Sequence, residues 1–155
     1  MRENIDSFFA ELPRPEDLRG ETEERLRAFY GAAADVIATR STYFRLEAVL
    51  YQETPAGSDL IETFEQSERY LLGQIANVIQ VIATDAGVPR PGPFAVEMAE
   101  LTISLTRGSV RPLGRADDAE RVKITMRRLA HLIGLCIDDA VAHGTFPMSQ
   151  LVERS

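Results

Sequence analysis

Two glutamates, Glu47 and Glu68, fall on the apolar sides of segments with helical periodicity. In the stretch STYFRLEAVLYQE, residues 41–53, Glu47 lies one helical turn from both Tyr43 and Tyr51 on a single stripe. An ionised carboxylate without a partner in a protein interior costs several kcal/mol. An arginine from another helix, a raised pKa, or a cationic or hydrogen-bonding ligand in a cavity would each offset this cost.

Glu68 has the same setting on a longer helix, whose apolar face consists of Ile61, Phe64, Leu71, Leu72, Ile75, Ile79 and Ile82. The two tyrosine rings beside Glu47 would suit a cation, which the ring faces and the carboxylate would both attract. The structural alternative is that Glu47 pairs with Arg40 or Arg25, and that the aromatic residues belong to the core.

The other reactive residues give little sign of catalysis. His131 and His143 are not spaced as a metal-binding pair, and Glu97 with Glu100 lacks the histidine that a two-metal bundle requires. The chain has no nucleophile elbow, phosphate loop or Cys-x-x-Cys motif, and its lone Cys136 reads as a buried thiol. We therefore predict no catalytic residue, no metal site and no cofactor.

The composition indicates one ordinary globular domain spanning residues 1–155. The formal net charge of −7 argues against nucleic-acid binding by this chain alone, because phosphate contacts need clustered Lys and Arg. No apolar run reaches the length of a membrane span, and the N-terminus lacks the layout of a signal peptide. We expect a cytoplasmic protein without membrane contacts.

The hydrophobic period is helical along the whole chain. Asp59 with Glu62 is expected to cap the longest helix, which Gly87 should end. The sequence predicts an all-α, antiparallel bundle of about six helices, at residues 3–12, 22–40, 42–53, 59–86, 93–108 and 117–143.

The last two predicted helices are apolar on two sides. Residues 93–108 carry one apolar stripe of Phe94, Met98, Leu101 and Leu105, and a second on the opposite side of Val96, Ala99 and Ile103. Residues 117–143 carry a core face of Val122, Met126, Leu129, Ile133 and Ile137. The charged side of the same helix also carries apolar residues, namely Ile124, Leu135 and Ala142. Such a helix must bury both sides, so we predict a homodimer; a fully interior helix is the alternative. The predicted interface consists of Val96, Ala99, Ile103, Ile124, His131, Leu135 and Ala142.

The helix order and lengths resemble the effector-binding half of TetR-family transcriptional regulators. The segment that opens this half is similar to ERLRAFYGAAADVIATRSTYFRLEAVLYQE. The rest of the half is similar to SERYLLGQIANVIQVIATDAG, the Pro-rich loop and the two final helices. The likeness extends from about Phe8 to Gly144 and rests on helix lengths and apolar spacing. The family's N-terminal helix-turn-helix domain has no counterpart here, since MRENIDSFFAEL would match only the end of the helix that connects the two halves.

The resemblance implies a regulator, such as a repressor, whose last two helices form a four-helix interface with a second copy. It also implies a small, largely apolar effector held between the second to fifth helices, and the tyrosine rings beside Glu47 would allow this effector to carry a positive charge. The effector cavity would be lined by Phe29, Tyr30, Tyr43, Glu47, Tyr51, Phe64, Glu68, Leu71, Phe94 and Met98.

Two other readings stay open. The first is a freestanding enzyme of the TetR fold that acts on an apolar small molecule, with Glu47 or Glu68 as general acid or base. The second is an interaction domain without a small ligand. As a regulator, the protein would contact DNA only through an N-terminal domain that is not present here.

Overall fold

Helices make up the described part of this chain, as the periodicity predicts. The computed structural model describes residues 2–40, 53–55, 58–110 and 118–144, and in these ranges it contains α-helices and one 3-10 turn but no strand. The elements are α1 (Arg2–Ala10), η1 (Pro15–Asp17), α2 (Thr22–Thr39), α4 (Asp59–Ala86), α5 (Pro91–Val110) and α6 (Asp118–His143). The all-α prediction is confirmed, whereas the helix predicted at residues 42–53 lies almost entirely outside the described residues.

Local capping explains where the helices begin and end. The Glu24 carboxylate accepts a hydrogen bond of 3.1 Å from the backbone N–H of Glu21, which closes a capping box at the start of α2. At the start of α4, Ser58 Oγ accepts from the backbone N–H of Ile61 at 3.3 Å. The cap is therefore Ser58 and not the predicted Asp59, because a serine just before the first turn satisfies the same free N–H group. Gly87 ends α4 as predicted, with φ of 88°.

Two glycines, one inside α4 and one at its C-terminal cap, should respond in opposite ways to the same substitution. Gly87→Ala is expected to lower the free energy of unfolding by about 1–2 kcal/mol, because its positive φ disfavours a Cβ atom. Gly73→Ala is expected to raise it by about 0.5–1 kcal/mol, because Gly73 lies inside the helix and a Cβ there meets no atom within 4 Å. Urea denaturation followed by circular dichroism would measure both. Changes of the same sign would contradict this account.

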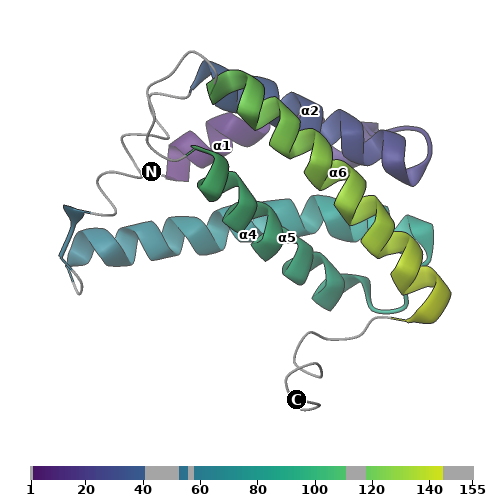
Figure 1. Cartoon of the computed structure of the whole chain (residues 1–155). Coiled ribbons are helices and arrows are strands. Elements are labelled where there is room, and N and C mark those ends of the chain that lie inside the picture. Colours follow the sequence, from purple (N-terminus) through teal and green to yellow (C-terminus); the bar gives the residue numbers. More distant parts are fainter. Residues whose placement is uncertain (1, 41–52, 56–57, 111–117, 145–155) are drawn as a thin grey trace.

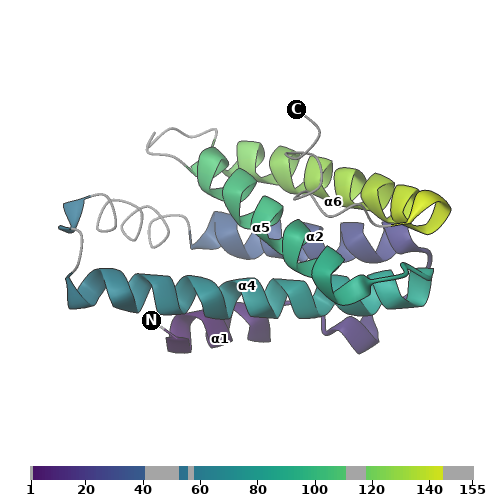
Figure 2. The ribbon, with the colours of Figure 1, turned by 90° about the horizontal axis from the view of Figure 1, so that it is seen from below.

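The helices pack as two pairs joined through α5. Helix α2 packs along α6, α4 packs along α5, and α5 also contacts α6 (Figure 1). Turned by 90°, the structure has α1 beneath α4 at one edge and α6 along the opposite edge (Figure 2). The core lies between these layers, and it includes the predicted face of α6, namely Val122, Met126, Leu129, Ile133 and Ile137.

The buried face of α5 differs from both predicted stripes. It is centred on the small residues Ala95 and Ala99, and it includes Ile103. Because α5 contacts α4 and α6 at once, this face is wide, and alanines allow the close approach of its neighbours. Ala99 and Ile103, which belong to the predicted subunit interface, are therefore buried within one chain. Val96 of the same predicted stripe is exposed.

Polar contacts attach α1 to the rest of the bundle. The Tyr70 hydroxyl of α4 donates to Asp6 Oδ1 at 2.5 Å. At the end of α2, Arg40 donates to Ser7 Oγ at 3.0 Å and forms an ion pair with Glu11. None of the helices in the described ranges is long and apolar enough to cross a membrane.

Candidate functional site

The predicted ligand-binding residues divide between the core, its edge and the segment outside the described residues. Tyr43, Glu47 and Tyr51 belong to that segment, so the surroundings of these three residues stay a prediction. The side chains of Phe29, Tyr30, Phe64 and Phe94 are buried, while those of Leu71 and Met98 are partly buried against the core. The structure thus gathers most of the described set in or beside one apolar interior.

Tyr30 and Thr102 form a buried polar pair between α2 and α5. Their hydroxyl oxygens are 2.7 Å apart. Thr102 Oγ1 also lies 2.8 Å from the backbone carbonyl oxygen of Met98, to which it donates its hydrogen. Since a threonine hydroxyl has one hydrogen, the Tyr30 hydroxyl must be the donor to Thr102. This ordered chain of donors is the most deeply buried polar feature among the predicted ligand-binding residues.

The buried environment of Tyr30 changes the pKa of its hydroxyl group. Burial raises the pKa of Tyr30 well above its ordinary value, and the hydrogen bond to Thr102 opposes that shift only in part. In the unfolded chain the same phenol ionises near its ordinary pKa of about 10. Between that pH and the higher folded pKa, the unfolded state binds fewer protons than the folded state, so stability falls as pH rises.

We expect the free energy of unfolding to fall as the pH rises above about 10, by at most about 1.4 kcal/mol per pH unit. Tyr30→Phe should lack this component, so its unfolding free energy should decline less steeply from about pH 9 to about pH 11. Urea titrations of both proteins across this range would measure the difference. Parallel pH profiles would contradict the assignment.

Glu68 has an arginine partner. Its Oε1 is 2.7 Å from Arg107 Nη1 on α5, and about a third of the Glu68 side chain remains exposed. Of the three ways to offset the cost of a carboxylate on an apolar helix face, the structure shows the first, an arginine from another helix. Glu68 lies on the side of α4 that faces α5. Arg107 belongs to the last turn of α5, and from there its side chain reaches the Glu68 carboxylate.

The arginines considered as partners for Glu47 have partners of their own. Arg25 Nη1 lies 2.8 Å from Asp85 Oδ2, which joins α2 to the end of α4. Arg40 forms its ion pair with Glu11. Glu47 lies outside the described residues, so its pairing with either arginine stays a prediction.

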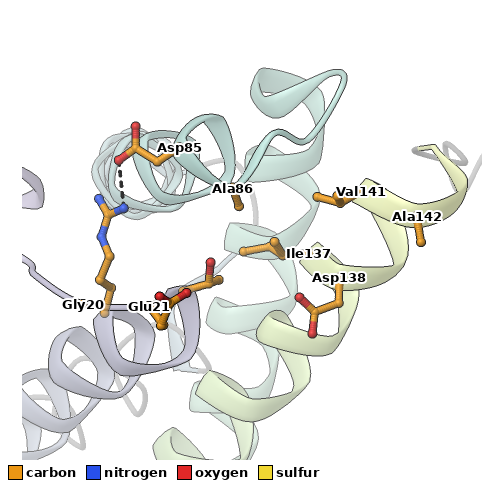
Figure 3. Close-up of a pocket in the computed structure, with 10 residues that line it drawn as sticks. Gly20, Glu21, Asp85, Ala86, Ile137, Asp138, Val141 and Ala142 are labelled. Atoms are coloured by element: carbon orange, nitrogen blue, oxygen red, sulfur yellow. Dashed lines mark hydrogen bonds and ion pairs between the residues drawn. The ribbon is translucent and has the colours of Figure 1, made fainter.

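An open depression of about 470 Å³ lies where the start of α2, the end of α4 and the last turns of α6 meet (Figure 3). Its apolar part includes Ile137 and Val141, and its carboxylates are those of Glu21, Asp85 and Asp138. None of its residues belongs to the predicted ligand-binding set. Two of its four charged groups, Arg25 and Asp85, already pair with each other, as the dashed line in Figure 3 marks.

The comparisons with known proteins leave the family open. The chain matches no protein-family model, no curated protein and no solved structure. The TetR resemblance therefore stays a hypothesis drawn from the sequence, and the arrangement of residues has to support any function by itself.

The predicted interface residues of α6 all lie on its surface. Ile124, His131, Leu135 and Ala142 are exposed, and His131 Nδ1 is 3.6 Å from Glu23 Oε1 on α2. In the described ranges, no group of three or more His, Cys, Asp or Glu residues is arranged to hold a metal ion. Cys136 is half-buried, and burial, followed by the nearby charge of Asp139, raises its thiol pKa, which disfavours a reactive thiolate.

Sequence reasoning missed two residues of this region, Thr102 and Arg107. Thr102 lies in the segment LTISLT, where hydroxyl and apolar residues alternate, so the sequence does not distinguish the buried Thr102 from the exposed Ser104. Arg107 is 39 residues from Glu68, and this separation gives no local signal of their pairing.

Proposed function

We propose that this chain is a homodimeric, small-molecule-binding domain of a TetR-like regulator. A small, mostly apolar effector would bind between α2, α4 and α5 together with residues 41–53, and the signal would pass to a DNA-binding domain through the subunit arrangement. The effector class that suits the available groups is an apolar molecule with a positive charge or hydrogen-bond donors.

The observation that carries this proposal is the placement of the Glu68–Arg107 ion pair. Glu68 lies one turn from the buried Phe64 on α4, and Arg107 belongs to α5. Small-molecule sites combine apolar and aromatic walls with a few polar groups that orient the ligand. An ion pair beside a buried aromatic side chain supplies such groups, since a ligand can compete for either partner.

The ion pair also disfavours the enzyme alternative for Glu68. A general acid or base needs a carboxyl group that is free to exchange a proton with the substrate. Glu68 is instead in contact with a guanidinium group. We therefore propose binding rather than catalysis at this position.

Native mass spectrometry of the purified chain would test the proposal. We expect a dimer that carries additional mass under gentle conditions and loses it on denaturation. Glu68→Gln should reduce the fraction of chains with this adduct, because it removes the charge of the predicted site. Glu65→Gln, an exposed neutral substitution one turn earlier on α4, is the matched control and should leave the fraction unchanged.

Two results would overturn the proposal. The first is a chain of bare mass that also fails to take up tetraphenylphosphonium, an apolar cation added as a probe. The second is uptake of that probe to the same extent by the unmodified chain and by the Glu47→Gln/Glu68→Gln double variant.

A further inference from the structure

The outer side of α6 carries an ordered stripe of exposed residues. Successive members are four, three, four, three and four residues apart, which keeps them on one face of a helix. This stripe, called the α6 seam below, consists of Ile124, Arg128, His131, Leu135, Asp138 and Ala142, all of which are exposed.

Exposed apolar side chains are concentrated at the seam and its borders. Of the seven exposed large hydrophobic residues in the described ranges, four belong to α6: Ile124 (37%), Leu132 (40%), Leu135 (52%) and Val141 (47%). Helix α6 already buries its opposite side in the core and lies at an edge of the bundle (Figure 2). A helix with two apolar sides is stable in water when the second side is also covered.

The spacing of the seam is the same when it is read from either end, with its centre at the position of Ile133. We propose that the α6 seam binds the α6 seam of a second copy in antiparallel orientation about this centre. Ile124 then faces Ala142 of the second copy, and His131 faces Leu135. Arg128 faces Asp138, so each dimer contains two such ion pairs.

Charge and size both fit this arrangement. Basic residues lie in the first half of the seam and the acidic residue in the second, so antiparallel pairing brings opposite charges together, whereas parallel pairing in register brings like charges together. Size fits because the large Ile124 faces the small Ala142, and at the border of the seam Leu132 meets Leu132 of the second copy. The partner that these features select is another copy of this chain.

This inference rests on the proposed homodimer and specifies how it forms. It differs from the interface expected from the sequence, because Ala99 and Ile103 of α5 are buried in the core. The contact is therefore centred on α6 and its copy.

A charge exchange on the full chain tests the pairing. Arg128→Asp and Asp138→Arg should each raise the dimer dissociation constant at least about 100-fold, because each creates two like-charge contacts. The double variant Arg128→Asp/Asp138→Arg should restore dimerisation. An equimolar mixture of the two single variants should form heterodimers, since both of their contacts pair opposite charges. Analytical ultracentrifugation would give the dissociation constants, and native mass spectrometry would identify the heterodimer.

Matched controls come from α4, where Glu65 and Arg69 are exposed. Arg69→Asp and Glu65→Arg make the same kinds of charge change away from the seam and should leave the dimer intact. Circular dichroism would show whether each variant folds, and formation of the heterodimer would itself exclude misfolding of the single variants.

Three outcomes would overturn the pairing: an unmodified chain that is monomeric at all concentrations, single variants that dimerise normally, or single variants that fail to form heterodimers when mixed. Failure of the proposed function has a separate signature. A dimer that obeys the charge exchange but binds no small molecule would refute the effector site and support the α6 pairing.

Discussion

Leu26→Ala is expected to lower the free energy of unfolding by about 2–5 kcal/mol. Leu26 is fully buried on α2, and it faces α6 near Gly134, where a Cβ atom would lie 3.7 Å from Leu26 Cδ1. The close packing of α2 against α6 leaves little room for the structure to collapse into the cavity. Since a domain of this size is stable by about 5–15 kcal/mol, one substitution would remove a large share of that stability.

Chemical denaturation with a fit for both the midpoint and the slope would measure the loss. Leu105→Ala is the matched control, because it removes the same atoms from an exposed position on α5 and should cost less than about 1 kcal/mol. Equal losses in the two variants would mean that the α2–α6 contact is not a principal part of the core.

The Tyr30–Thr102 pair should respond unequally to the removal of either partner. Thr102→Val leaves the Tyr30 hydroxyl buried without its acceptor, and we expect a cost of about 1–3 kcal/mol. Tyr30→Phe should cost only about 0.5–1.5 kcal/mol, because Thr102 keeps its hydrogen bond to the carbonyl of Met98.

The double variant Tyr30→Phe/Thr102→Val gives the sharper test. It should be more stable than Thr102→Val alone, because the substitution of Tyr30 removes the hydroxyl that the first change left without a partner. A double-mutant cycle from urea titrations would measure this coupling. A double variant whose losses simply add would show that the two hydroxyl groups do not depend on each other.

Much of the fold could be predicted because its signals are local. Helical periodicity gave the limits of α2, α4 and α6 to within a residue or two, and Gly87 marked the end of α4. The burial of α5 could not be predicted in the same way. Its core face is centred on Ala95 and Ala99, and hydropathy alone favours the larger residues beside them.

The candidate site was harder to predict because its contacts are not local. The sequence showed that Glu68 on an apolar face needs a partner, but only the packing of α4 on α5 identifies Arg107. The Tyr30–Thr102 bond joins residues 72 positions apart and depends on the approach of α2 to α5. The predictions for Tyr43, Glu47 and Tyr51 lie outside the described residues and remain predictions.

The packing of α2 along α6 also has a consequence for synthesis of the chain. Helix α2 emerges from the ribosome before α6, which covers its apolar face and is made only after α4 and α5. At translation rates of about 5–20 residues per second, this face waits on the order of ten seconds for its partner. During that interval a nascent chain that ends before α6 exposes the side chains of Leu26 and Phe29, and these are the sites at which we expect chaperones to bind it.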